Sequence, residues 1–497
     1  MNETIQELPP PPHAWWSAPY FTQEGWRPGS VPYFQAAVVF ITLVYIFETY
    51  LDFRQHQKLK EKKFPEPLRD AIGSLGTFTT KKKKEKTKTE EEETNSDDGD
   101  DKKQEDSEQI SLLDATLEKF DKSRAYGLDK STFGFISGAY SQVEATTLLF
   151  LGYLPFMWTL SGRVLAAIGV DETNEIYLAI MLLTLTSIRD TLVGLPFSLY
   201  STFVVEARHG FNKQTLGLFF MDKIKGFLLF MVIGYPVTAG LIFVIRWGGA
   251  YFYLYVWAFL FAFSLVMLTL YPVLIMPLFN KFTPLDEGEL RTRIEALASS
   301  LAFPLAKLFV CDGSKRSSHS NAYFFGFFKS KRIVLFDTLL EQATHDEIIA
   351  ILGHELGHWK LWHTAQGFAI QQVYTFACFY VFGLCMNDAE LFASFGFSND
   401  SKPVIIGFLL FSQTVWAPVE HVLSFLITLN TRKNEFQADA FAVDLGHEEG
   451  LRSGLTKLAI ENLSNMNPDA LYSAYHYSHP PLVERLNAIT DRAKKLK

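Results

Sequence analysis

Long apolar segments alternate with charged stretches along this chain, and seven of the apolar segments have the length of a membrane-spanning helix. The hydrocarbon core of a bilayer takes about 20 apolar residues of helix. The pattern therefore predicts a mainly α-helical, multi-pass membrane protein. The predicted spans are 32–51, 142–162, 176–200, 227–246, 251–276, 366–386 and 403–429.

Several of these predicted spans carry ionisable residues. The second contains Glu144, the third contains Arg189 and Asp190, and the seventh contains Glu420 and His421. Charges at membrane depth are costly unless they face protein or water. Two interpretations stay open: ion pairs between neighbouring helices, or a wet interior that the spans enclose.

Lysine and arginine residues predict the orientation of the spans. They cluster after the first, third and seventh spans and at 492–497, whereas the alternate connections are short or acidic. Because basic loops face the cytosol, we expect a lumenal N-terminus and a cytosolic C-terminus. Glycosylation sequons at Asn2 and Asn399 then face the lumen, while the sequon at Asn462 faces the cytosol and stays bare.

The composition excludes several classes of function. Basic runs alternate with acidic ones, so the net charge of −8 is segmental and nucleic-acid binding is not expected. The three cysteines, Cys311, Cys378 and Cys385, exclude a disulfide scaffold and a cysteine-based zinc site.

Two charged segments carry open alternatives. Residues 81–108, within an insertion at about 75–110, are too polar to bury a core and predict a disordered linker. The lysines at 81–84 could also contact membrane lipid. The residues at 494–497 have the pattern of a dilysine retrieval signal for the endoplasmic reticulum, or form a solvated helix end.

The candidate chemistry lies in an HExxH motif formed by His354, Glu355 and His358, which follows an apolar run compatible with a helix. Residues four apart share a helix face. Both imidazoles can therefore bind one Zn²⁺, and Glu355 can activate a water molecule for hydrolysis. The alternative is a surface helix with two unrelated histidines.

A third ligand is expected on another helix. His363 follows His358 by five residues, about 140° around a helix, and is rejected. Glu435, directly after the seventh span, could complete a His₂Glu site with one open position. Asp439, four residues later, could accept the spare N–H of a ligand histidine. The alternative is a solvated helix face.

At these and other motifs the chain resembles the CAAX prenyl protease 1 family of integral-membrane zinc metalloproteases. The resemblance covers nearly the whole chain, apart from the insertion at 75–110, which is longer and more charged than the family pattern. The motifs that carry it are 50–55, 203–215, 319–326, 353–358, 434–439 and 478–485.

The resemblance implies a seven-helix bundle around a water-filled chamber, with a gluzincin-like protease domain that carries a small β-hairpin or sheet. It implies one zinc ion per chain on His354, His358 and Glu435, with Glu355 as general base. The implied domains are 1–31, a lumenal segment; 32–276, spans one to five; 277–365, the protease region with the HExxH helix; 366–429, spans six and seven; and 430–497, a cytosolic part with the third ligand.

Further site residues follow from the same resemblance. His479 and Arg485 are the candidates to stabilise the oxyanion, although 478–481 also has the pattern of a turn that starts a helix. Asn321, Ala322 and Tyr323 are expected to hold substrate. Their segment predicts an edge strand, with 332–336 as its neighbour; the alternative is an ordinary core hairpin.

The implied reaction is cleavage of farnesylated CaaX proteins, which releases the last three residues, with a second upstream cut in some members. Prelamin A and the yeast mating pheromone are examples of such substrates. The implied location is the endoplasmic reticulum membrane, with the inner nuclear membrane as a second site. Competing hypotheses are a membrane quality-control protease and a non-catalytic scaffold. The sequence predicts no oligomeric state.

Overall fold

The structure is a computed structural model, which describes residues 31–73, 75, 77–81, 107–326, 331–397 and 402–497. The sequons at Asn2 and Asn399 lie outside the described residues. The helices are α1 Tyr33–Lys60, α2 Glu66–Ile72, α3 Leu112–Phe150, α4 Tyr153–Ala167, α5 Glu175–Tyr200, α6 Leu216–Leu229, α7 Tyr235–Trp247, α8 Phe252–Leu270, α9 Glu289–Ser300, α10 Asp337–Gln342, α11 His345–Lys360, α12 His363–Cys385, α13 Ala389–Ser394, α14 Val404–Phe411, α15 Ala417–Asp444, α16 Glu448–Glu461, α17 Ala470–His476 and α18 Leu482–Leu496.

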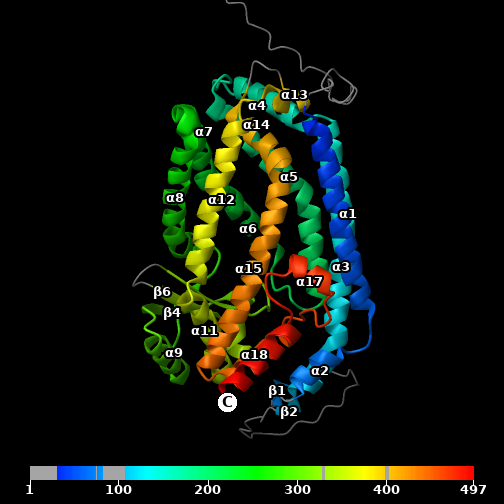
Figure 1. The fold of residues 1–497 in the computed structure, drawn as a ribbon, viewed down its shortest axis with the longest axis vertical. Helices are drawn as coiled ribbons and strands as arrows, with labels where there is room; N and C mark the ends of the chain where they lie inside the picture. The colour runs from blue at the N-terminus through cyan, green and yellow to red at the C-terminus, as the bar shows by residue number, and fades with distance from the viewer. Residues whose placement is uncertain (1–30, 74, 76, 82–106, 327–330, 398–401) are drawn as a thin grey trace, which may run out of the picture.

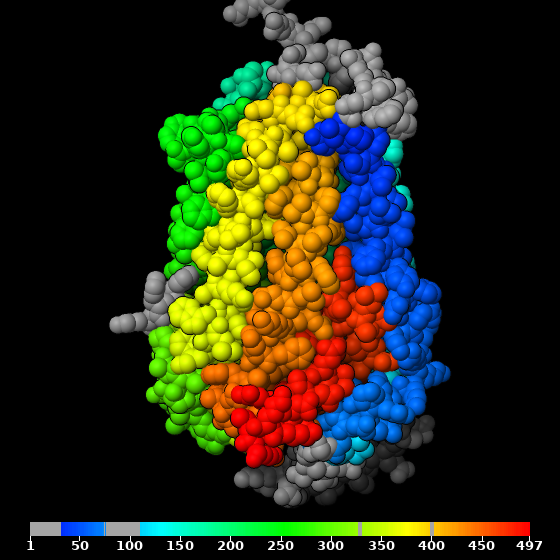
Figure 2. Space-filling view, in the orientation of Figure 1, coloured from blue at the N-terminus to red at the C-terminus, as the bar shows by residue number. Residues whose placement is uncertain are grey.

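Long apolar helices run along the upper part of the molecule (Figure 1). Six segments among the described residues are long and apolar enough to cross a bilayer, and they overlap six of the seven predicted spans. Figure 2 shows α1, α15 and α12 on one face, with α18 across its lower end. The six segments are Tyr33–Lys60, Glu175–Glu206, Leu216–Trp247, Gly249–Leu278, His363–Cys385 and Val404–Asp444.

The second predicted span, 142–162, is wrong as a straight helix. Helices α3 and α4 meet there at a bend of 69°, and together they form the seventh candidate crossing. Gly152 adopts a left-handed conformation at the bend, with φ of 63°. Glycine adopts this conformation without the steric cost that other residues bear.

The charge in the third predicted span is paired. Arg189 on α5 forms an ion pair with Glu144 on α3 and a second with Asp190. The interhelical pairing that the sequence left open therefore occurs at this position.

The lower part of the molecule holds a four-stranded mixed sheet, β3-β4-β6-β5, which is larger than a hairpin. Strands β4 and β6 are parallel, and β5 pairs antiparallel with β6 at the edge. Apolar side chains of the sheet, α9 and α11 form one core, which includes Ile294, Ile333, Leu335, Leu352 and Leu356. The strands are β3 Phe282–Pro284, β4 Leu305–Cys311, β5 Ala322–Phe325 and β6 Lys331–Phe336.

The ends of the charged insertion are ordered. Strands β1 Thr77–Lys81 and β2 Ser107–Ser111 pair antiparallel, with Thr77 opposite Ser111. The expectation of disorder across 75–110 is therefore wrong at both ends, where backbone pairing supplies the hydrogen bonds. Its middle, 82–106, lies outside the described residues.

The predicted boundary at 429/430 falls inside a continuous helix. Helix α15 runs from Ala417 to Asp444, and no Gly or Pro interrupts it after Pro418. A helix of residues with ordinary propensity continues until a breaker or a cap ends it. The seventh span therefore extends directly into the protease part of the molecule.

Candidate active site

Helix α11 carries the HExxH motif, and side-chain hydrogen bonds hold its first turn in place. Thr344 Oγ1 accepts a hydrogen bond from Glu347 N at 3.4 Å, and Glu347 Oε2 accepts one from Thr344 N at 2.8 Å, which forms a capping box. The buried Glu347 carboxylate also pairs with Lys457 Nζ at 2.8 Å and accepts a hydrogen bond from Ser453. The helix that carries the motif is thereby fixed to α16.

Helices α11 and α15 approach each other closely beside the motif. A Cβ atom on Gly357 would lie 3.1 Å from Phe441 Cδ1 and 3.3 Å from Ala438 Cα. Glycine at this position therefore allows the close approach. It brings the face of α15 that carries Glu435 and Asp439 against His354 and His358.

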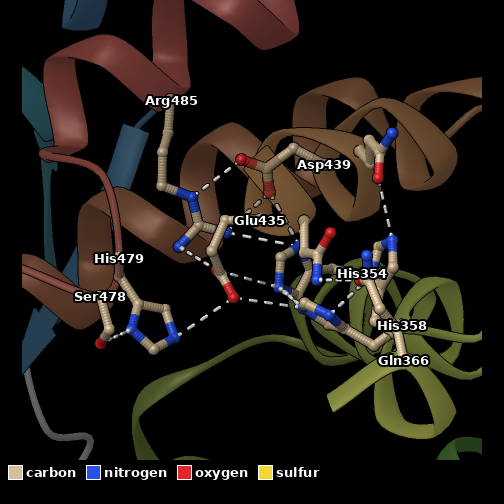
Figure 3. A network of polar contacts seen from close by, with 11 residues as sticks. His354, His358, Gln366, Glu435, Asp439, Ser478, His479 and Arg485 are labelled. Atoms are coloured by element: carbon tan, nitrogen blue, oxygen red, sulfur yellow. Dashed lines mark hydrogen bonds and ion pairs between the residues drawn. The ribbon is translucent and has the colours of Figure 1, made fainter. Parts of the chain in front are cut away.

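The structure brings the three predicted ligands together (Figure 3). His354 Nε2 lies 3.2 Å from His358 Nε2. Glu435 Oε2 lies 3.6 Å from His354 Nε2, and Glu435 Oε1 lies 3.3 Å from His358 Nε2. One ligand atom from each of the three residues lies within 4.8 Å of the other two. His354 and Glu435 are buried, with exposed fractions of 6% and 3%.

The outer nitrogens of both histidines have partners that assign their protons. His354 Nδ1 lies 2.9 Å from Asp439 Oδ1, so this nitrogen donates and Nε2 carries a lone pair. His363 Nε2 lies 3.0 Å from Gln437 Oε1, and His363 Nδ1 lies 3.1 Å from His358 Nδ1. If His363 donates to Gln437, its Nδ1 accepts from His358, and Nε2 of His358 also carries a lone pair.

These atoms fit a metal ion. Two nitrogen lone pairs and a carboxylate converge, and Glu435 Oε2 finds no hydrogen-bond donor among the described residues although it is buried. Buried acceptors without a donor are unfavourable unless a cation satisfies them. A His₂Glu set with no thiolate suits zinc.

His363 lies on a different helix from His358, although its rejection as a metal ligand assumed that both lie on one helix. The sequence argument placed it on the same helix as His358, but α11 ends at Lys360 and α12 begins at His363. Trp362 turns the chain between them in a left-handed conformation, with φ of 62°. His363 stays outside the ligand group. It contacts Nδ1 of His358, whereas Nε2 of His358 is the atom close to Glu435.

Arg485 and His479 reach the same site from the C-terminal segment (Figure 3). The buried Arg485 guanidinium donates to both Asp439 oxygens, at 2.8 and 2.6 Å, and Nη1 lies 3.8 Å from Glu435 Oε2. His479 Nε2 lies 3.5 Å from Glu435 Oε1, and its side chain is 65% exposed. Arg485 is thus held by carboxylates, whereas His479 is accessible.

A long-range contact holds this C-terminal segment in place. Arg54, near the end of α1, donates to Asp469 at 3.1 and 2.9 Å, and Gln55 Oε1 accepts from Asp469 N at 2.9 Å. Asp469 starts α17, which precedes His479. Sequence reasoning missed this contact, because the partners are 415 residues apart and neither has a local signal.

Glu355 faces a large apolar cavity of about 1160 Å³. Burial raises the pKa of the Glu355 carboxyl above its ordinary value, and His354 and His358 oppose the shift. The cavity extends from Glu355 and His358 to aromatic side chains on β5, on α11 and α12 and in the turn between these helices, which include Phe324, Phe325, Trp359, Trp362 and Phe368.

The predicted edge strand is confirmed. Strand β5 includes Ala322 and Tyr323, and one of its sides faces no other strand in the described sheet. Asn321 precedes the strand, and its Oδ1 accepts from Ala322 N at 2.8 Å. Asn321 is exposed, Tyr323 lines the apolar cavity, and Ala322 is buried.

Comparison with known proteins gives the same family along most of the chain. A family model described as CAAX prenyl protease N-terminal, five membrane helices, matches residues 55–281, and one described as Peptidase family M48 matches residues 284–493. The chain is 49% identical over 467 residues to the CAAX prenyl protease 1 homolog of Oryza sativa subsp. japonica, across 94% of this chain and 99% of the relative.

Two further matches agree. The CAAX prenyl protease 1 homolog of Homo sapiens is 47% identical over 409 residues, across 75% of this chain and 86% of the relative. The crystal structure of S. mikatae Ste24p is 37% identical, with a TM-score of 0.79, across 93% of this chain and 99% of that one. The resemblance found in the sequence is confirmed: this chain belongs to the CAAX prenyl protease 1 family, whose peptidase domain is of family M48.

Proposed function

We propose that this protein is a zinc-dependent membrane endopeptidase that cleaves farnesylated CaaX proteins and releases their last three residues. The observation that carries the proposal is the apolar cavity, which runs without interruption from Glu355 and His358 to a wall of aromatic residues. A peptidase for ordinary polar peptides has no need of such a wall beside its base. A prenyl chain on the substrate cysteine would bury its hydrocarbon there.

His354, His358 and Glu435 would hold the zinc ion. Bound there, zinc supplies the positive charge that makes a water molecule acidic and polarises a carbonyl group. Asp439 fixes the ring of His354 through Nδ1, and His363 fixes the ring of His358. These outer contacts keep the Nε2 lone pairs directed at one point.

Glu355 would act as the general base. Its raised pKa moves the carboxylate toward the range in which a base accepts a proton effectively near neutral pH. It lines the cavity in which the scissile bond would lie, so it can take the proton from the attacking water and pass it to the leaving amine.

His479 would donate to the oxyanion, because it is the accessible group beside Glu435. Arg485, bound to Asp439, would act as a positioning residue that keeps Asp439 and Glu435 ionised. The free side of β5 would hold the substrate backbone at Ala322 and Tyr323, with Asn321 at the start of this edge.

The proposed setting is the endoplasmic reticulum membrane and the inner nuclear membrane, with a lumenal N-terminus and a cytosolic C-terminus. The site would then open toward the cytosolic side, where prenylated proteins are made. A second, upstream cut of a longer substrate is part of the proposal, since main-chain pairing along β5 does not demand a particular sequence.

The test is hydrolysis of one CaaX peptide with and without its farnesyl group. We expect cleavage before the last three residues, a strong preference for the farnesylated form, and loss of activity with chelator that zinc restores. Equal cleavage of both forms would favour a quality-control protease and contradict the proposal.

A further inference from the structure

A second cavity of about 580 Å³ lies between α1, α3 and the segment that leads to α17. Most of the residues that line it are polar, so its lining is more polar than that of the apolar cavity beside Glu355. Gln55 is 5% exposed, and its Nε2 finds no hydrogen-bond partner within the described part of the chain. Lys130 lines the same cavity and forms no ion pair with a carboxylate among the described residues. Lys130 Nζ makes one long hydrogen bond, 3.5 Å, to Tyr126 Oη. The Gln55 amide N–H groups and the remaining Nζ hydrogens can therefore donate to a ligand in this cavity.

This polar cavity lies next to the candidate active site. Tyr477 lines it, and Tyr477 is two residues from His479, whose ring lies 3.5 Å from Glu435. His319 lines it too, three residues before β5 begins at Ala322. Three extended residues span about 10 Å. His319 is therefore no farther from the start of β5 than three extended substrate residues would reach.

The wall of the polar cavity at His319 is firmly built. The ring of His319 stacks on Phe211 at 4.0 Å, and Ser318 N donates to Phe211 O at 3.2 Å. Ser320 N donates to Asn462 Oδ1 at 3.2 Å. These contacts fix the segment that connects the cavity to the edge strand.

The two cavities lie toward opposite ends of β5. Phe325 and Gly326, at its carboxyl end, line the apolar cavity, whereas His319 precedes its amino end and lines the polar one. Antiparallel pairing is slightly more stable per residue than parallel pairing, and β5 already pairs this way with β6. A substrate added antiparallel to β5 runs from the apolar cavity toward the polar cavity, so its C-terminal end points at the latter.

We infer that the polar cavity binds the free C-terminal carboxylate of the substrate, through Lys130 Nζ and Gln55 Nε2. The inference depends on the proposed function, because only a substrate cut three residues from its end places a carboxylate there. Charge-assisted hydrogen bonds of this kind are stronger than neutral ones. The cavity would thus measure the distance from the scissile bond to the end of the chain.

Nearby carboxylates locate the binding end of the cavity. Asp52 lines the cavity one helical turn before Gln55 and would repel an anion, so the carboxylate binds at the Lys130 end. Asp129, beside Lys130, already pairs with Arg208 and His209, each at 2.8 Å. Glu206 accepts from Tyr126 at 2.7 Å.

The experiment compares two farnesylated CaaX peptides, one with a free C-terminal carboxylate and one with a C-terminal carboxamide. The full-length protein in detergent is assayed for kcat/KM with each. We expect the acid-to-amide ratio to be about ten in the unaltered protein, which is the factor that about 1.4 kcal/mol gives. The ratio should fall to about one in Lys130→Met and return in Lys130→Arg. Gln55→Leu should lower it in part.

Lys122→Met is the matched control, since Lys122 is an exposed lysine on the same helix α3. It should leave the ratio unchanged. A ratio near one in the unaltered protein, or a ratio that Lys130→Met and Gln55→Leu both leave unchanged, overturns the inference while the proposed function stands. If the unaltered protein cleaves neither peptide, the proposed function fails and the inference falls with it.

Discussion

Replacing Asp439 with Asn tests whether the buried contacts behind the ligands support the metal site. The Asp439 carboxylate is 1% exposed, accepts from His354 Nδ1 at 2.9 Å and receives two hydrogen bonds from Arg485. Asp439→Asn keeps the shape but removes the charge. Among the described residues, Glu435, 3.8 Å away, is then the carboxylate that still forms an ion pair with the buried Arg485.

Two magnitudes follow from this geometry. Loss of an outer partner of a metal-bound histidine lowers metal affinity about 10- to 100-fold, which is about 1.4 to 2.7 kcal/mol. Loss of one member of a buried ion pair destabilises a protein by about 3–5 kcal/mol. Glu435 offsets part of the second cost, so we expect about 3 kcal/mol.

Zinc affinity would be measured by competition with a chelating dye, and stability by denaturant unfolding in detergent. Asp444→Asn is the matched control, because Asp444 lies on the same helix and receives two hydrogen bonds from Arg492, both at 2.7 Å, in an exposed position. It should change neither quantity measurably. Zinc affinity within twofold of the unaltered protein in Asp439→Asn would refute the reasoning.

Three further outcomes are expected. Glu355→Gln should lower kcat at least about 100-fold while zinc content stays stoichiometric, because the base is lost and the ligands remain; near-full activity would exclude Glu355 as the base. Because the pKa of Glu355 is raised, the carboxylate that acts as base is lost as the pH falls through a value above 4.5. The fall of kcat/KM on the acid side should therefore be centred above pH 4.5, and it should be absent from the residual rate of Glu355→Gln. Lys457→Met should destabilise the protein by about 3 kcal/mol, because it leaves the buried Glu347 charge with weaker partners, and Glu347→Leu combined with Lys457→Met should recover much of the loss in denaturant unfolding.

Local patterns predicted much of this structure. The four-residue spacings of His354 and His358, and of Glu435 and Asp439, place each pair on one face of a helix, and the helices meet as the ligand set requires. Glu347 was missed, although Thr344 three residues earlier gives the sequence pattern of a capping box.

Other features had weaker signals or none. The bend at Gly152 has a weak signal in the sequence, because Gly152 and Pro155 interrupt an apolar run that was assigned to a single span. The turn at Trp362 carries none, since no Gly or Pro lies beside it, so His363 was placed on the wrong helix. The donors that line the polar cavity depend on distant packing of α1, α3 and the C-terminal segment, which no local pattern encodes.

The unbroken course of α15 has a consequence for dissecting this enzyme. Glu435 and Asp439 lie on α15, which belongs to a candidate membrane span, whereas His354 and His358 lie on α11, which is not part of a candidate span. A fragment that began at 430 would leave Glu435 within two turns of a severed helix end, where the backbone frays. A soluble fragment without the first part of α15 is therefore expected to lose the position of Glu435, because one continuous helix contains both this ligand and a candidate membrane span.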